Sequence, residues 1–167
     1  MGRDAIALIF LLSTSIGLLS LLPVFRRLQP YRRASFYLAL CILLTTVLVG
    51  LGKKITNVDC PWDLQRYGGS YPYVHIFSDR PDELPRGGCF PGGHSSGGFS
   101  LLALYFLLRR YRKDLRWFGL STGAAVGLLF SLGQAVRGAH FLSHDLWSAA
   151  IAWTIALLLS RIMLTRR

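Results

Sequence analysis

Residues 34–52 read ASFYLALCILLTTVLVGLG, an apolar run of 19 residues without a charge. An α-helix needs about 20 apolar residues to cross the hydrocarbon core of a bilayer, so this run predicts a membrane-spanning helix. Four further apolar runs predict spans of the same kind, at residues 5–25, 95–108, 117–136 and 146–164. The predicted fold class is therefore all-α. We expect one membrane domain over residues 1–167, a polytopic bundle of about five transmembrane helices.

The charge pattern supports this reading, because the chain is 52% hydrophobic and yet carries a net charge of +11. Such basicity can also indicate nucleic-acid binding. Here, however, the basic residues stand in short clusters between the apolar runs, as topology signals do. We therefore predict a bilayer as partner and no nucleic acid. The clusters are residues 26–33, residues 109–116, and Arg161 with Arg166 and Arg167.

The same clusters predict an orientation. Basic loops favour the cytoplasmic side, so the other connections face outward. Residues 53–94 and 137–145 then share the outer face, and these two stretches contain all four histidines. We expect an integral protein of a bacterial inner membrane with these two histidine-bearing stretches on the periplasmic face. The sequence carries no signal for an oligomeric state.

The outer loop, residues 53–94, is rich in Pro, Gly, Tyr and Asp and lacks a helical apolar period. A loop of this length is often functional or disordered, and its many aromatic residues argue for order. Cys60 and Cys89 both fall within it. In an oxidising compartment these two thiols can form a disulfide that closes the loop, and the alternative is two unpaired thiols.

Two patterns carry the residue types that handle phosphate. In the first, Gly92 and Gly93 precede His94 at the start of a predicted helix. Unpaired N–H groups at such a start attract an anion, and a histidine beside it can donate a proton. Lys53 and Lys54, at the outer end of the second span, add cations.

In the second pattern, Arg137, His140 and His144 follow one another at spacings of three and four residues. If this segment is helical, the three side chains share one face. Asp145 can orient one imidazole and stabilise its charged form. Two histidines, a carboxylate, several cations and an N–H cradle together predict a site for phosphate chemistry.

These residues resemble the type 2 phosphatidic acid phosphatase superfamily, the membrane lipid phosphatases related to vanadium haloperoxidases. The first family motif is Lys, six residues, then Arg-Pro. Here Lys53 and Cys60-Pro61 keep the spacing, with Cys60 in place of the arginine. The second motif is Pro-Ser-Gly-His, which here reads Pro91-Gly92-Gly93-His94.

The third family motif is Ser-Arg, five residues, His, three residues, Asp. With His140 as the motif histidine, the arginine falls on Gln134 and the aspartate on His144. Arg137 lies one helical turn after Gln134, and Asp145 lies one residue after His144. The resemblance therefore leaves open whether Asp145 or, as the less favoured choice, His144 holds the ring of the motif histidine, His140. In all, the resemblance extends over residues 53–145, in the family's order.

The resemblance implies a metal-independent and cofactor-free double displacement on a phosphorylated membrane lipid. His140 would attack phosphorus and form a phosphohistidine, and His94 would protonate the leaving oxygen and then activate water. Asp145 would hold His140. The groups expected to stabilise phosphate charge are Lys53, Arg137 and the Gly92 and Gly93 amides, with Lys54 and Arg66 as further candidates.

Other functions stay open at this stage. Cys60 and Gln134 lack the family arginines, which motivates a non-catalytic lipid-phosphate-binding or scaffold protein. A lipid phosphotransferase would use the same phosphohistidine with an alcohol as acceptor. A metal site built from His94, His140 and His144 is disfavoured, because the surrounding Lys and Arg would repel a dication.

Overall fold

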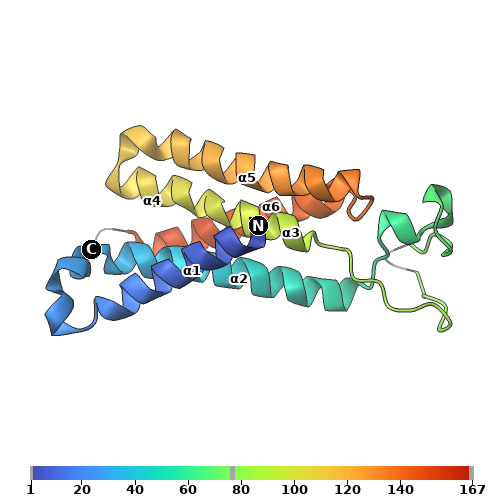
Figure 1. The fold of residues 1–167 in the computed structure, drawn as a ribbon, viewed down its shortest axis with the longest axis horizontal. Helices are drawn as coiled ribbons and strands as arrows, with labels where there is room; N and C mark the ends of the chain where they lie inside the picture. Colours follow the sequence, from blue (N-terminus) through green and yellow to red (C-terminus); the bar gives the residue numbers. More distant parts are fainter. Residues whose placement is uncertain (1, 76–77, 166–167) are drawn as a thin grey trace.

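The chain forms an all-helical bundle in a computed structural model that describes residues 2–75 and 78–165 (Figure 1). The predicted all-α class with about five long helical segments is confirmed. Three of the helical stretches are long and apolar enough to cross a membrane, namely those that contain α2, α5 and α6. The helices are α1 Gly2–Leu19, α2 Arg32–Thr56, α3 Gly93–Phe99, α4 Ala103–Tyr111, α5 Arg116–Val136 and α6 Leu142–Met163.

The two ends of the bundle differ in what they carry. The long loop after α2 and the α5–α6 connection lie at one end, while the α4–α5 connection and the C-terminus lie at the other (Figure 1). The segments expected on one face thus do share an end, and the basic clusters gather at the opposite end. Arg166 and Arg167, two members of the third cluster, lie outside the described residues.

The first predicted span, 5–25, is too long. α1 ends at Leu19, and Pro23–Tyr31 forms a 3₁₀ segment, η1, that leads into α2. Pro23 has no N–H to donate into a preceding turn, so an α-helix cannot run through it unbroken. α2 is longer than predicted and ends where Asn57 adopts a left-handed conformation, with φ 50°. The outer loop is therefore residues 57–92, and it contains short 3₁₀ turns at Pro61–Asp63 and Gln65–Tyr67.

The third span runs without a break in helical conformation from Gly93 through the 3₁₀ turn Ser100–Leu102 to Tyr111. Gly98 of this span and Gly123 of α5 lie where the two helices pack directly against each other. A Cβ on Gly98 would lie 2.7 Å from the Cα of Gly127, and one on Gly123 would lie 2.5 Å from the backbone nitrogen of Leu102. Small residues allow membrane helices to approach this closely. The contact fixes α3 beside α5, at the end of the bundle that carries the long loop after α2.

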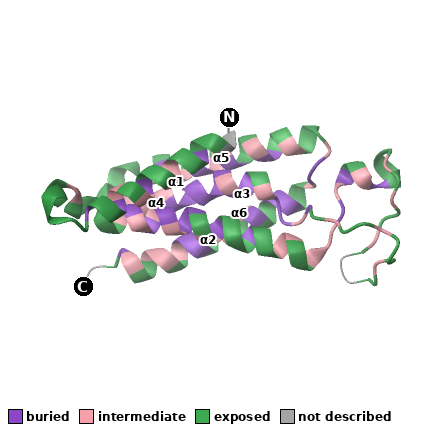
Figure 2. Ribbon diagram, turned by 60° about the horizontal axis from the view of Figure 1, so that its bottom comes forward, coloured by how far each residue is buried: buried purple, intermediate pink, exposed green. Residues whose placement is uncertain are grey.

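The interior of the bundle is buried while its outward faces expose large apolar residues (Figure 2). Tyr37 is fully buried, and its hydroxyl donates a hydrogen bond to the carbonyl of Ala156 at 3.0 Å, which joins α2 to α6. Leu8 and Leu48 are about half exposed, and Leu129 is 66% exposed. A continuous exposed apolar surface of this kind suits a lipid environment, so the chain is an integral membrane protein.

Candidate active site

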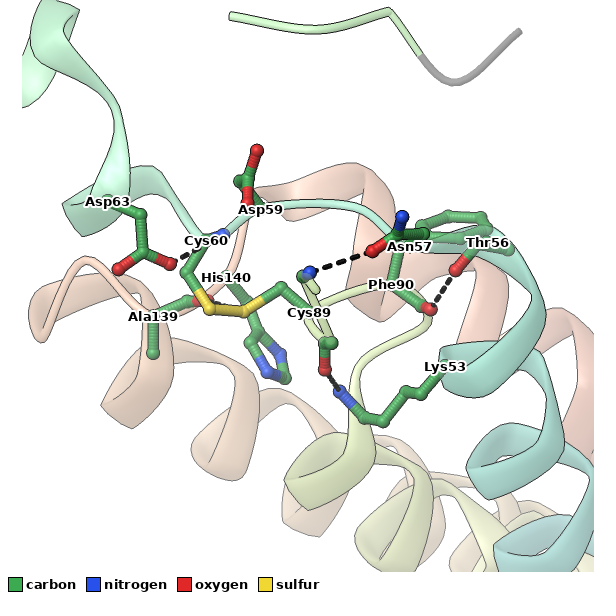
Figure 3. Close-up of a disulfide and its surroundings, with 12 residues drawn as sticks. Lys53, Thr56, Asn57, Asp59, Cys60, Asp63, Cys89, Phe90, Ala139 and His140 are labelled. Carbon is green, nitrogen blue, oxygen red and sulfur yellow. Dashed lines mark hydrogen bonds between the residues drawn. A yellow bond between two sulfur atoms is a disulfide. The ribbon is translucent and has the colours of Figure 1, made fainter. Parts of the chain in front are cut away.

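Four segments meet at the end of the bundle that carries the long loop after α2. They are the last turn of α2, the start of α3, the α5–α6 connection and the first turn of α6. Gly138 turns the connection, with φ 66°, a left-handed conformation that glycine adopts without strain. His140 follows two residues later and lies close to the loop that carries the two cysteines (Figure 3).

A histidine–carboxylate pair forms the centre of the site. His140 Nδ1 lies 3.2 Å from Asp145 Oδ1, and the two residues are 8% and 2% exposed. Because α6 begins at Leu142, Asp145 falls in its first turn and points back toward His140. Asp145 rather than His144 is therefore the partner that contacts the candidate nucleophile. This contact supports Asp145, of the two choices that the sequence left open, as the residue that would orient His140.

His144 has different surroundings. Its ring packs edge-on against Phe90 and Phe141, with ring centroids 5.3 Å apart in both pairs. The ring centroid of His140 is 5.9 Å away. Within the part of the chain that the structure describes, the buried Nδ1 of His144 has no hydrogen-bond partner. His144 thus forms part of the apolar wall behind the pair.

Ser95 is a site residue that the sequence reasoning missed. Its hydroxyl donates a hydrogen bond to Asp145 Oδ1 at 2.5 Å, the same oxygen that faces His140. Ser95 is fully buried. The sequence hints at this role only through the position of Ser95, which directly follows His94 of the second motif. The face of α3 that carries Ser95 packs against α6.

Gly92 packs against the same group of atoms. A Cβ on Gly92 would lie 2.4 Å from Asp145 Oδ1, 2.5 Å from Ser95 Oγ and 2.9 Å from His140 Nδ1. The resembled motif has serine here, and this site leaves no space for that side chain. The Gly92 N–H donates to the His144 carbonyl at 3.0 Å. In the structure this bond occupies the Gly92 amide that was predicted to bind phosphate, and the contribution of Gly92 seen here is its packing against the pair.

Lys53 reaches the site from the end of α2. A Cβ on Gly93 would lie 2.9 Å from Lys53 Cε, so the lysine stem crosses directly over this glycine. Its ammonium donates a hydrogen bond to the Gly88 carbonyl at 2.7 Å (Figure 3). Lys53 and Gly93 thus adjoin Gly92 and, through it, the His140–Asp145 pair.

A disulfide between Cys60 and Cys89 covers this arrangement, with the two Cα atoms 5.1 Å apart (Figure 3). Cys89 Sγ lies 3.3 Å from the carbonyl of Ala139, the residue before His140. The Thr56 hydroxyl donates to the Phe90 carbonyl at 2.7 Å and holds the same segment to the end of α2. The bridge therefore fixes the segment that carries Gly88 above the site.

The rest of the outer loop is anchored by an ion pair. The Arg80 guanidinium donates two hydrogen bonds to the Asp59 carboxylate, at 2.6 and 2.7 Å. These bonds raise the pKa of Arg80 above its ordinary value. A forked arginine–carboxylate contact of this kind is geometrically specific. The loop is thus an ordered cover on the site within the residues that the structure describes.

His94 lies on the other side of the site. It is exposed, and it lines a groove of about 470 Å³ together with Gly93 and Gly97. The other walls are almost entirely apolar and come from three further helices. They are Ile6, Ala7 and Phe10 of α1, Ile42, Leu43 and Thr46 of α2, and Phe130 of α5.

Three of the predicted phosphate ligands make no contact with the His140–Asp145 pair among the described residues. Arg137 is exposed at the end of α5, and Arg66 is exposed in the outer loop. Lys54 is also exposed, and its carbonyl accepts a hydrogen bond from Arg86. Cys60, which stands in place of a family arginine, forms the disulfide with Cys89 and so cannot bind phosphate as an arginine would. No group of three or more potential metal ligands occurs within residues 2–75 and 78–165.

Comparison with known proteins identifies the region that contains this site. The family model described as PAP2 superfamily matches residues 34–167, which is most of the chain and includes every candidate site residue. α1 lies outside the matched residues. No curated protein and no solved structure shows a significant match.

Proposed function

We propose that this chain, which belongs to the PAP2 superfamily, removes phosphate from a membrane lipid phosphate or diphosphate through a phosphohistidine. Membership supports phosphatase-type activity on phosphate esters in general. The observation that carries the proposal is the buried His140–Asp145 pair, held by Ser95 at the end of the bundle. A histidine oriented by a carboxylate is the arrangement that turns an imidazole into a nucleophile.

The first step is attack on phosphorus by His140. Its Nδ1–H donates to Asp145, which leaves the lone pair on Nε2 free to form the P–N bond. The bond from phosphorus to the lipid oxygen breaks, and His94 gives that oxygen a proton. Lys53 offsets the charge on the phosphoryl oxygens, and electrostatic stabilisation of this kind is usually the largest catalytic contribution.

In the second step, His94 takes a proton from water, and the water oxygen attacks phosphorus as the P–N bond breaks. Phosphate leaves, and His140 recovers its lone pair. Asp145 keeps the imidazole in one orientation through both steps and balances its positive charge. No metal ion takes part in this scheme.

The apolar groove supports a lipid substrate. It starts at His94 and continues between α1, α2, α3 and α5, so a lipid tail can occupy it while the phosphate reaches the dyad. The disulfide suits an oxidising compartment, and the basic clusters at the opposite end suit the cytoplasm. Both support a site on the outer face of a bacterial inner membrane.

The test is phosphate release by the purified protein in detergent. The panel contains phosphatidic acid, phosphatidylglycerol phosphate, undecaprenyl diphosphate, lipid A and the soluble ester p-nitrophenyl phosphate. We expect release by the wild type, loss in His140→Ala, and retention in His75→Ala, the matched histidine control outside the motifs. With a ³²P-labelled substrate, His94→Ala should accumulate an acid-labile phosphoprotein that His140→Ala lacks. Full activity of His140→Ala would refute the nucleophile assignment.

The lipid part is tested separately by filling the groove. Thr46→Trp should lower kcat/KM for the lipid far more than for the soluble ester. Val47→Trp, on the exposed neighbouring position, is the matched control and should change neither. Equal losses for both substrates would show that the groove does not hold the tail.

A binding-only role is the second candidate, favoured by the loss of arginine at Cys60 and Gln134. In that case the wild type would bind a lipid phosphate and release no phosphate from any member of the panel. Transfer of the phosphoryl group to an added lipid alcohol, instead of water, would identify a phosphotransferase.

A further inference from the structure

We infer that the cytoplasmic end of the bundle holds the phosphate headgroup of an anionic membrane lipid, in a pocket between α4 and α6 that is separate from the active site. The pocket has a volume of about 390 Å³. Its polar wall includes three arginines, Arg109, Arg110 and Arg161, and its apolar wall includes Phe106, Leu157 and Leu164.

The arginines come from two helices. Arg109 and Arg110 stand in the last turn of α4, and Arg161 stands in the last turn of α6. The helices are held together beneath the pocket by aromatic packing, with the rings of Phe106 and Trp153 4.8 Å apart. This packing places Arg161 in the same pocket as Arg109 and Arg110, although it is distant from them in sequence.

Arg110 is held in place. Its Nε donates to the Leu164 carbonyl at 3.0 Å, and its guanidinium carbon lies 5.4 Å from the centre of the Tyr111 ring. The bond satisfies a carbonyl at the C-terminal end of α6, where unpaired carbonyls would otherwise repel an anion. The guanidinium is thus oriented before any ligand arrives.

Among the residues that the structure describes, no acidic side chain lines the pocket to balance these charges. Asp114 is the acidic residue of the α4–α5 connection, and it pairs with Arg112 at 3.2 Å. The described ion pairs include none between an acidic residue and an arginine of the pocket. Three guanidinium groups around one space repel each other, and a phosphate offers the forked acceptor geometry that arginine matches.

The apolar wall favours a lipid over a free anion. Phe106 and Leu164 are buried, and Leu157 is half-buried. A lipid can place its headgroup on the arginines and the first methylenes of its tail on this wall. Basic pockets between membrane helices on the cytoplasmic side bind anionic headgroups by this combination.

A topology signal is the competing explanation for these arginines. That role depends on positive charge near the helix ends and is indifferent to whether lysine or arginine provides it. A headgroup pocket depends on the arginine fork. The double variant Arg109→Lys/Arg161→Lys therefore separates the two explanations, because it keeps the charge and removes the fork.

The experiment measures lipid retention by native mass spectrometry and thermal unfolding of the full-length protein in a neutral detergent. The probes are phosphatidylglycerol, phosphatidylcholine with the same acyl chains, and inorganic phosphate. We expect phosphatidylglycerol alone to be retained and to raise Tm. The Lys double variant should retain it about tenfold less, because each lysine forms one charge-assisted bond where arginine forms two.

The matched control is Arg112→Gln/Lys113→Gln, which removes two charges next to the pocket and should retain phosphatidylglycerol like the wild type. Circular dichroism verifies that both double variants fold. Retention by the Lys variant equal to wild type would overturn the proposal, and so would an equal loss in the control. A Tm increase from inorganic phosphate as large as that from the lipid would also overturn it, in favour of a free-anion site.

Discussion

Restoring the family residue at Gly92 is the sharpest test of the site. Gly92→Ser converts Pro91-Gly92-Gly93-His94 to the Pro-Ser-Gly-His sequence of the resembled motif. A consensus argument predicts a neutral or improved enzyme, because family residues are commonly stabilising. The structure predicts the opposite, because the new Cβ would lie 2.4 Å from Asp145 Oδ1 and 2.5 Å from Ser95 Oγ.

The size of the effect follows from which atoms must move. Ordinary contact between non-bonded heavy atoms is about 3.5 Å, so the Asp145 carboxylate must retreat by about 1 Å. The displaced atoms belong to side-chain ends, so overpacking should cost only about 1–3 kcal/mol of stability. They are, however, the atoms that orient His140. A misplacement of about 1 Å at a catalytic group can reduce the rate about 100-fold.

The assay is kcat and Tm of Gly92→Ser and Gly92→Ala, measured on the lipid that the wild type hydrolyses best. Gly50→Ala and Gly133→Ala are the controls, because a Cβ at either position meets nothing within 4 Å. We expect the Gly92 variants to lose about two orders of magnitude in kcat with a modest fall in Tm. Near wild-type kcat in Gly92→Ser would refute the packing described for the site.

Three further predictions concern the support of the site. Ser95→Ala should lower kcat by about tenfold or more at unchanged KM, because a hydrogen bond to a charged group is worth about 1.5–3 kcal/mol. Cys89→Ser, which opens a bridge over a sequence separation of 29 residues, should lose about 3–4 kcal/mol of stability in a denaturant melt. Cys41→Ala is the control, because Cys41 is a free cysteine and its replacement opens no disulfide. It should not show this loss of stability. Lys53→Met should reduce kcat about 100-fold or more, while Lys54→Met should stay within a few-fold in the same phosphate-release assay.

The arrangement of the bundle was predictable because it depends on the lengths of apolar runs and on charge. Both signals are local, and the bilayer dictates both. They gave the helical class, and they placed residues 53–94 and 137–145 at one end. These two signals predicted the C-terminal end of α1 less accurately. The apolar run continues beyond Leu19, but Pro23 interrupts the helix, and hydropathy does not register that loss of an N–H donor.

The details of the site depend on contacts between distant segments, which sequence patterns do not report. Ser95 and Asp145 are 50 positions apart, and their hydrogen bond exists only because α3 packs beside the first turn of α6. The surroundings of the Gly92 amide could not be predicted for the same reason. The His144 carbonyl, from α6, accepts that N–H before any ligand can.

The departure from the family arginine at Cys60 is weak support for a binding-only protein. At Cys60 the change has a structural use, since the sulfur closes the loop over His140. Meanwhile Asp145 is 2% exposed, and its Oδ2 has no hydrogen-bond partner among the described residues. A buried carboxylate with an unsatisfied oxygen costs roughly several kcal/mol. Binding alone would not require that cost, whereas a phosphohistidine does require a fixed imidazole, so the retained pair favours turnover.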